Sequence, residues 1–236
     1  MMLVGRLSAA YRMARIARRW SNRELLRFST LLRGDIVNVS GWEDKDKQGG
    51  RYRNYFPLAT SYSITNYGGA RGSSSGSDEI ELDLELPPHE SLINAFDVVF
   101  NHTVLEHVYD VRAAVKTLCA LSRDVVILVV PFVQEQHYTE SYGDFWRFTP
   151  MVLKRMMSEN GFTTFYLSWN HHRYAATYIF ALAARDPSKH TDLIDALEPG
   201  SRRLLHRHPG AWVGESLRKF VLRQGRLLLS TFRRIS

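Results

Sequence analysis

The 236-residue sequence has little of what marks a membrane-spanning, secreted or disulfide-stabilised protein. Its longest apolar run, residues 125–133, is interrupted by Pro131 and is too short to cross a bilayer as a helix. The N-terminus is rich in arginine but has no apolar core followed by small residues at a cleavage site, so we expect no secretory signal. A single cysteine, Cys119, excludes an internal disulfide and fits a reducing compartment. These absences predict a cytoplasmic protein.

Motifs that mark several other enzyme classes are also missing. The chain contains neither a phosphate-binding P-loop nor a nucleophile elbow. Its nine histidines include three close pairs, but none of these pairs has the HExxH or Cys/His spacing of a zinc site. We therefore expect no metal centre. The pairs are His102 and His107, His171 and His172, and His206 and His208.

Charge is unevenly distributed along the chain. Residues 1–33 carry a net charge of +7 and residues 201–236 carry +8, whereas the whole chain carries +7, so the middle is acidic at −8. An Arg-rich tail is either a solvated helix or a surface for an anionic partner. Nucleic acid is the weaker anionic candidate, because the tails lack the regular aromatic residues on which single-stranded bases stack.

Both tails are predicted to be amphipathic helices. In the first, apolar residues recur every three or four positions over residues 3–14, and Ser21 is expected to cap a second helix with Glu24 at the capping-box position. In the last segment, residues 188–236, one apolar stripe runs through residues 213–235. Two alternatives are open: the stripes insert into an anionic membrane surface, or they pack on the body or on a second copy of the chain in a homo-oligomer.

The middle of the chain has the pattern of one α/β domain. Short apolar or alternating runs, bounded by Gly, Pro and polar residues, predict strands. Two helices are predicted between them, one capped by Asp110 and one that begins at Thr149-Pro150 and ends at Asn160-Gly161. Strands that alternate with helices predict a mostly parallel sheet of six or seven strands with helices on both faces. The predicted strands are residues 35–40, 60–66, 80–84, 96–101, 124–131, 162–169 and 177–184.

Three motifs in the body occur in the order and with the gaps of a known family. FDVVFNHTVLEHVYD (96–110) is followed by VVILVVPF (125–132) and YGDFWRFTP (142–150). The stretch that contains them resembles the class I S-adenosylmethionine-dependent methyltransferases, of the small-molecule type common in polysaccharide and secondary-metabolite pathways. The triplet Leu105-Glu106-His107 is similar to the one that follows their fourth strand. The resemblance covers about residues 34–185 and implies a Rossmann-like fold with S-adenosylmethionine as cofactor.

The resemblance also implies where this cofactor binds, since ligands of open parallel sheets lie beyond the carboxyl ends of the strands. We expect it to contact Val39, Ser40, Gly41, Asn66, Asp83, Asn101, His102 and Thr103. Two of these positions depart from the family. The acidic residue and Gly-x-Gly of the first turn are replaced by the segment Asn38-Val39-Ser40-Gly41-Trp42, and the acid that binds the ribose is replaced by Asn66. A neutral amide loses the charge-assisted hydrogen bond of a carboxylate, so cofactor binding is expected to be weakened or lost.

Four further residues are expected near the acceptor. His137 follows the fifth strand and is either a general base or a surface-loop histidine. Asp144 and Arg147 are three residues apart in an aromatic turn and form either an ion pair that holds a lid or a clamp for an anionic acceptor. Trp146 and its neighbours Phe145 and Phe148 are expected to pack as that lid over the apolar residues 129–132.

Two functions from different classes are consistent with these patterns. The first is a methyltransferase that acts on a small-molecule or glycan acceptor, to which the protein supplies proximity, orientation and one base. The second is a binding or scaffold protein that has kept the methyltransferase fold and no longer methylates. In either case we expect three units: a basic arm (1–33), a methyltransferase-like domain (34–187) and a basic extension (188–236).

Overall fold

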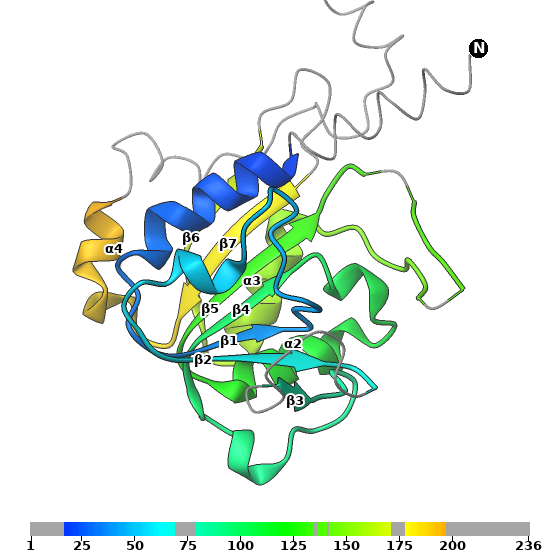
Figure 1. Ribbon diagram of the computed structural model, residues 1–236, viewed down its shortest axis with the longest axis horizontal. Coiled ribbons are helices and arrows are strands. Elements are labelled where there is room, and N and C mark those ends of the chain that lie inside the picture. The colour runs from blue at the N-terminus through cyan, green and yellow to red at the C-terminus, as the bar shows by residue number, and fades with distance from the viewer. Residues whose placement is uncertain (1–16, 69–78, 135, 141, 171–177, 197–236) are drawn as a thin grey trace, which may run out of the picture.

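The computed structural model describes residues 17–68, 79–134, 136–140, 142–170 and 178–196 (Figure 1). The apolar stripes at residues 3–14 and 213–235 lie outside these described residues. Their contact with a membrane, with the body or with a second copy therefore stays a prediction. Among the helices that are described, none has the length and the apolar character needed to span a bilayer.

Seven strands form one sheet in the order β3-β2-β1-β4-β5-β7-β6. β7 is antiparallel to its neighbours β5 and β6, and the other pairs are parallel, which confirms the predicted mostly parallel sheet. β3 is shorter than predicted, because the chain turns at Asp83, whose carboxylate accepts a hydrogen bond from the Glu85 amide at 2.9 Å. The strands are β1 (Gly34–Val39), β2 (Ala59–Asn66), β3 (Glu79–Glu81), β4 (Phe96–His102), β5 (Ser122–Pro131), β6 (Thr163–Trp169) and β7 (Tyr178–Ala184).

The middle of the sheet is buried on both faces. β4, β5 and β7 are nearly continuous apolar runs, and almost all of their side chains are shielded from solvent. Such runs are expected where helices or loops cover both sides of a sheet. Predicting β1, β4 and β5 as central buried strands was therefore correct.

Two helices cover one face. They are α2 (Val111–Leu121), whose N-cap Asp110 accepts a hydrogen bond from the Ala113 amide, and α3 (Pro150–Glu159), whose N-cap Thr149 accepts one from the Val152 amide. Both N-cap predictions are confirmed. α3 ends where predicted, and Gly161 adopts a φ of +79° there, a conformation that glycine takes without strain. Leu118 of α2 and Leu153 of α3 are completely buried against the sheet.

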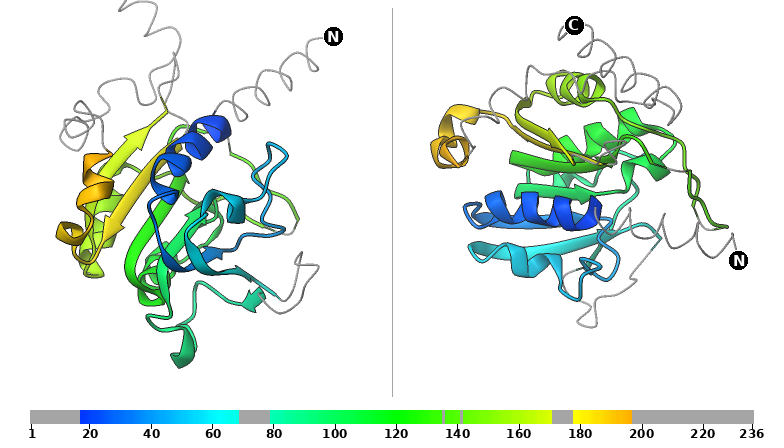
Figure 2. Two further views of the ribbon diagram at one scale, coloured as in Figure 1. Left: turned by 60° about the vertical axis from the view of Figure 1, so that its left-hand side comes forward. Right: turned by 90° about the horizontal axis from the view of Figure 1, so that it is seen from above.

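The opposite face is covered by the start of the chain. A helix whose described part is residues 17–29 lies over this face (Figures 1 and 2). It packs Leu25 and Phe28 against Tyr166 of β6 and Phe180 of β7. The loop between β1 and β2 completes this layer with η1 (Tyr52–Tyr55), and residues 40–58, all described, contain no α-helix. Residues 17–32 of the predicted basic arm thus share the domain's hydrophobic core.

The expected helix cap at Ser21 is wrong, because the helix runs through it. The Ser21 hydroxyl donates a hydrogen bond back to the Arg18 carbonyl at 3.0 Å. Glu24 does not form a capping box; its carboxylate accepts hydrogen bonds from Tyr166 and from Ser168 of β6. The remaining short helices are η2 (Glu90–Leu92), η3 (Leu105–His107), η4 (Pro187–Lys189) and α4 (Thr191–Asp195).

Candidate functional site

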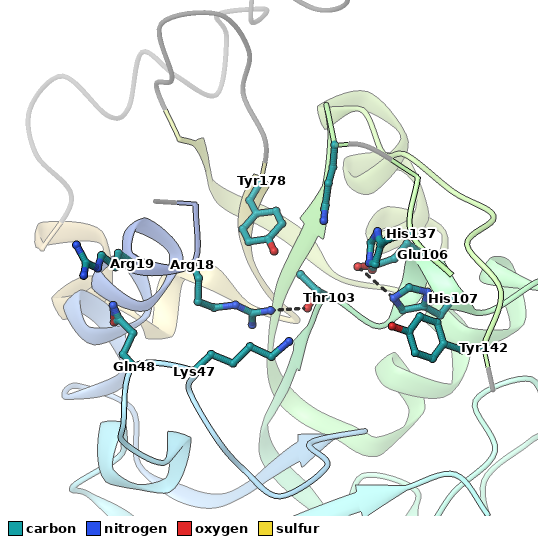
Figure 3. Close-up of a pocket in the computed structure, with 11 residues that line it drawn as sticks. Arg18, Arg19, Lys47, Gln48, Thr103, Glu106, His107, His137, Tyr142 and Tyr178 are labelled. Atoms are coloured by element: carbon teal, nitrogen blue, oxygen red, sulfur yellow. Dashed lines mark hydrogen bonds and ion pairs between the residues drawn. The ribbon is translucent and has the colours of Figure 1, made fainter. Parts of the chain in front are cut away.

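A cavity of about 310 Å³ lies beyond the carboxyl ends of β4 and β5 (Figure 3). Thr103 follows β4, Glu106 and His107 lie in η3, and Gln134 follows β5. Because β7 is antiparallel, its first residue, Tyr178, reaches the same edge of the sheet. The other lining residues come from the N-terminal helix, the β1–β2 loop and the segment after β5: Arg18, Arg19, Lys47, Gln48, His137 and Tyr142.

The turn after β1 has backbone conformations that favour glycine, but other residues adopt them. Ser40 has a φ of +55° and Trp42 a φ of +52°. A left-handed conformation costs a residue with a side chain about 1–2 kcal/mol. Gly41 lies between these residues, where a Cβ atom would come within 2.6 Å of the Asn38 side-chain nitrogen. The turn therefore holds two residues with side chains in left-handed conformations, at an energetic cost.

The Asn66 carboxamide is bonded to protein groups at both ends. Its Oδ1 accepts a hydrogen bond from the Trp42 amide at 2.8 Å, and its Nδ2 donates to the Trp42 carbonyl at 3.2 Å. The same Nδ2 donates to a carboxylate oxygen of Glu79, the first residue of β3. In the turn itself, the Ser40 amide donates to the Thr65 hydroxyl at 3.1 Å. Hydrogen-bonding groups on this side of the sheet edge are thus satisfied within the protein.

Asn101 at the end of β4 is bonded at only one end. Its Nδ2 donates to the Val39 carbonyl at 3.1 Å, whereas its buried Oδ1 has no hydrogen-bond partner. Thr103 is the one predicted cofactor residue among those that line the cavity. The other predicted cofactor residues are not among those that line it.

His102 lies in the wall between the cavity and the N-terminal helix. Its Nδ1 is 2.6 Å from an Arg18 guanidinium nitrogen, which donates to it, and its Nε2 is 2.9 Å from the Ser21 hydroxyl. Burial, together with the nearby charges of Arg18 and Lys47, holds the pKa of His102 well below its usual value. A neutral His102 accepts from Arg18 and so fixes the direction of that guanidinium.

Glu106 is a buried carboxyl group in the cavity wall. Its side chain is 0% exposed, and neither carboxyl oxygen has a hydrogen-bond partner. The Nε2 atom of His107 is 3.8 Å from Oε1, beyond hydrogen-bond distance. Burial raises the pKa of Glu106 to about 8, so the group keeps its proton at neutral pH.

Two histidine rings meet on this side of the cavity. His107 donates from Nδ1 to the Gly143 carbonyl at 2.6 Å, which leaves Nε2 as its basic nitrogen. Burial lowers the pKa of His107, so it is neutral at physiological pH. Its ring centroid lies 5.0 Å from that of His137 and 4.5 Å from that of Tyr142.

Asp144 and Arg147 form the predicted ion pair. The two guanidinium nitrogens Nη1 and Nη2 of Arg147 are 2.5 and 2.6 Å from the two carboxylate oxygens of Asp144. This pairing lowers the pKa of Asp144 to about 2. Asp144 also accepts a hydrogen bond from the His137 amide at 2.6 Å, and His137 Nδ1 is 3.5 Å from the same oxygen. The ion pair therefore orients His137 toward the cavity.

The expected aromatic lid is only partly correct. Phe148 is buried and its amide donates to the Pro131 carbonyl at 2.9 Å, as expected of a residue over the apolar floor. Phe145 and Trp146 are 50% and 40% exposed and turn instead toward Tyr109, whose carbonyl accepts from the indole of Trp146 at 3.0 Å. A pattern of aromatic residues shows that a segment packs, but not which of its side chains face inward.

One group of three potential metal ligands occurs among the described residues. Ligand atoms of Glu106, His107 and His137 lie within 4.8 Å of one another. The sequence spacing does not reveal this trio, because His137 reaches it only through the segment after β5. It offers one carboxyl group and two imidazoles, the donor types that bind zinc and iron.

Comparison with known proteins identifies the architecture. No model of a known protein family matches the sequence, and no curated protein sequence matches it. Solved structures do match. A chain of the complex that contains the Haloferax volcanii Trm112 methyltransferase activator has a TM-score of 0.51 at 9% identity, over 70% of this chain and 88% of that one. Burkholderia thailandensis 1,6-didemethyltoxoflavin-N1-methyltransferase has a TM-score of 0.50 at 12% identity, over 78% and 87%. The chain has the class I methyltransferase fold.

Some matched methyltransferases are longer. The CurJ carbon methyltransferase, with a TM-score of 0.47 and 14% identity, is matched over 65% of this chain and over 49% of its own, so this chain spans about half of that structure. In the methyltransferase fold, as in other open parallel sheets, the carboxyl ends of the strands form the ligand-binding edge. The cavity lies at this edge.

Sequence reasoning missed several residues of this methyltransferase-fold cavity. Arg18 was predicted to belong to a separate arm, and Lys47 lies in a charged loop with no recognisable motif. Arg18 reaches His102 across 84 residues of sequence, a contact that no local pattern encodes. Gln134 and Tyr178 adjoin predicted strands, and the expectation that strand ends meet was a usable signal for both.

Proposed function

We propose that the protein is an S-adenosylmethionine-dependent methyltransferase whose small-molecule acceptor binds in the cavity. The observation that carries this proposal is the convergence of Glu106, His107 and His137 on a cavity at the ligand-binding edge of a methyltransferase fold. Titratable groups that gather in a concave site are typical of active sites, and burial shifts the pKa values of two of these three, Glu106 and His107. The bound 1,6-didemethyltoxoflavin and S-adenosylhomocysteine of the Burkholderia structure support a small-molecule acceptor and this cofactor.

The residues at the β1 turn fit the cofactor if Glu79, rather than residue 66, supplies the carboxylate for the ribose. The turn has left-handed backbone conformations at Ser40 and Trp42, which glycine would adopt without strain, and Asn101 Oδ1 is a buried acceptor with no donor among the described residues. Asn66 lacks the carboxylate for the ribose hydroxyls, but its Nδ2 donates to Glu79, which brings a carboxylate to the end of β2. We assign the ribose to Glu79, the methionine end to the turn at Ser40, and the adenine, by resemblance, to Asp83.

S-adenosylmethionine, when bound, supplies an electrophilic methyl group. This chain's own residues would prepare the acceptor for it. Asp144, fixed by Arg147, orients His137 so that a ring nitrogen can take the proton from an acceptor hydroxyl or amine. Glu106 keeps its proton at neutral pH and leaves the cavity wall uncharged on that side. Glycan acceptors are the finer form of this proposal, and recruitment to an anionic membrane surface by the basic tails is a further extension of it.

A second candidate function is a binding protein that no longer methylates. The bonds between Asn66 and both main-chain groups of Trp42 favour it, because they fill the place where a cofactor would need donors and acceptors. In this case the cavity binds a ligand, and the β1 turn is structural.

Calorimetric titration with S-adenosylmethionine and S-adenosylhomocysteine separates the two candidates. We expect binding to the wild type, weakened about tenfold in Glu79→Gln because a charge-assisted hydrogen bond to the ribose is lost. Glu81→Gln is the matched control, since Glu81 is exposed on the same strand and its loss should leave affinity unchanged. If neither compound binds the wild type, the methyltransferase proposal is wrong and the second candidate stands. Once release of S-adenosylhomocysteine identifies an acceptor, His137→Gln should lower turnover about 100-fold.

A further inference from the structure

We infer that the ligand of this cavity carries a dianionic group, a phosphate monoester, that binds between Arg18 and Lys47. The inference names the substrate class of the proposed function and rests on that function only in calling the ligand a methyl acceptor. It is drawn from the charges that the fold leaves uncompensated at one end of the cavity.

The Arg18 guanidinium is held in place entirely by neutral groups. It donates to the Tyr52 hydroxyl at 3.0 Å, to the neutral ring of His102 at 2.6 Å and to the Thr103 hydroxyl at 3.1 Å. Its carbon centre lies 5.8 Å from the centroid of the Tyr178 ring. Within the described part of the chain, no carboxylate lies at ion-pair distance from it. A half-buried cation with a fixed direction and no counter-charge is a binding group for an anion.

Lys47 brings a second positive charge to the same place. Figure 3 shows its side chain and that of Arg18 both extending toward Thr103, whereas the Arg19 side chain is turned away from them. Lys47 is exposed as a residue, but desolvation by surrounding protein atoms, and then the nearby charge of Arg18, lowers its pKa. Lys47 has a φ of +59°, a strained conformation for a residue with a side chain. The ammonium group of Lys47 therefore lies near Arg18 despite a strained backbone and the repulsion between the two positive charges.

The acidic residues nearest to Lys47 in sequence form hydrogen bonds with other groups of the loop and the sheet. Asp44 accepts from the Asn38 side chain and the Tyr62 hydroxyl, at 2.9 and 2.7 Å. Asp46 accepts from the Gln48 amide and the Tyr55 hydroxyl, at 2.7 and 3.0 Å. Both carboxylates therefore stabilise the loop without neutralising Lys47.

The described lining residues place no carboxylate beside Arg18 and Lys47. Glu106 is the one acid among the described lining residues, and it lies across the cavity beside the histidines (Figure 3). Two inward cations at one end of the cavity match a ligand with two negative charges on one compact group. A phosphoryl group at the Arg18–Lys47 end directs the rest of such a ligand toward His137.

Binding of inorganic phosphate tests this inference without any methyl transfer. Phosphate should bind the full-length protein in calorimetry and raise its melting temperature, because a ligand of the folded state stabilises it. Acetate and chloride at matched ionic strength should do neither to a comparable degree. Lys47→Met should weaken phosphate binding about tenfold, the usual loss for one charge-assisted contact. Lys45→Met, the same change in the same loop at an exposed lysine paired with Glu43, should bind like the wild type.

Three results would overturn the inference: no phosphate binding to the wild type, equal binding of acetate, or equal weakening in Lys47→Met and Lys45→Met. Arg18→Lys serves as a second variant, since it keeps the charge and should retain part of the affinity. Failure here is distinguishable from failure of the proposed function. Phosphate binding without S-adenosylhomocysteine binding rejects only the methyltransferase, and the reverse result rejects only the phosphate site.

Discussion

The two halves of the ligand-binding edge treat their polar groups in opposite ways. On the β1–β2 half, the carboxamide of Asn66 is bonded at both ends to protein atoms, and so are the neighbouring turn amides. On the β4–β5 half, four buried oxygen atoms have no hydrogen-bond partner within the part of the chain that is described: Asn101 Oδ1, both carboxyl oxygens of Glu106 and Gln134 Oε1. The polar groups of the first half bond to one another, as in a structural element, whereas several polar atoms of the second half lack a partner among the described residues.

This difference shows which half of the edge leaves buried polar atoms available to a ligand. A buried polar atom without a partner costs about 1–3 kcal/mol, and native proteins keep few of them. Acceptors left unbonded around one cavity, opposite cations left without acids, indicate a place where a ligand completes the hydrogen bonding. The three predictions that follow test each half of the edge, from the largest expected effect to the smallest.

Replacing Glu106 by Gln should remove a pH dependence of stability. Burial raises the pKa of Glu106 to about 8, so between pH 5 and 8 the unfolded chain releases this proton while the folded protein retains it. The stability from this group is complete below its unfolded pKa and is lost as the pH rises toward 8, by about 4 kcal/mol over that interval. Urea unfolding across this range should show the loss in the wild type and not in Glu106→Gln.

The control for this prediction is Glu140→Gln, which alters an exposed acid in the segment after β5. It should keep the wild-type pH dependence. Parallel stability curves for the wild type and Glu106→Gln would show that Glu106 is ionised at neutral pH. Glu106 would then no longer support the contrast between the two halves of the edge.

Asn66→Asp tests the satisfied half. By resemblance it restores the family's acid, yet here it removes the donor to the Trp42 carbonyl and places a carboxylate against Glu79. We expect the free energy of unfolding to fall by about 3 kcal/mol, from one lost buried hydrogen bond and one like-charge contact. The double variant Asn66→Asp with Glu79→Gln should recover part of this, because glutamine can donate to the new carboxylate. A single variant as stable as the wild type would mean that the turn is not held by Asn66.

Arg147→Ala tests whether the two halves differ as described. It breaks the Asp144–Arg147 ion pair, which lies next to the buried atoms that have no hydrogen-bond partner among the described residues. The Asp144 side chain is 0% exposed, so losing its partner should cost about 2 kcal/mol without any ligand present. Thermal unfolding measures the loss. Arg155→Ala removes an exposed ion pair with Glu159 and should cost less than about 0.5 kcal/mol. If Arg147→Ala and Arg155→Ala lower the stability equally, the Asp144–Arg147 ion pair contributes no more than an exposed ion pair.

Much of the fold was predictable because it depends on local periodicity. Consecutive residues are enough to identify the apolar runs of β1, β4 and β5 and the helix caps at Asp110 and Thr149. The Asp144–Arg147 pair was predictable for the same reason, since the two residues are three apart. Patterns of this range identify elements and their ends.

The cavity was less predictable because it is assembled from distant segments. An amphipathic stripe shows that a helix packs, but not on what, so the helix that carries Arg18 was assigned to an arm. Glu79 is brought to Asn66 by strand pairing across 13 residues. Whether a buried acid such as Glu106 finds a partner depends on the whole packed environment, which the triplet around it does not encode.

The N-terminal helix has a consequence for how the chain folds during synthesis. It leaves the ribosome before the strands that it covers, since Glu24 bonds to Tyr166, 142 residues later, and Phe28 packs against β7 beyond that. At roughly 5–20 residues per second, this separation means a wait of about 7 to 28 s before its partners emerge. During that interval Leu25 and Phe28 lack the strands that bury them in the folded protein, so their apolar surface is exposed to solvent. The last strands of the sheet thus complete the layer that the first helix begins.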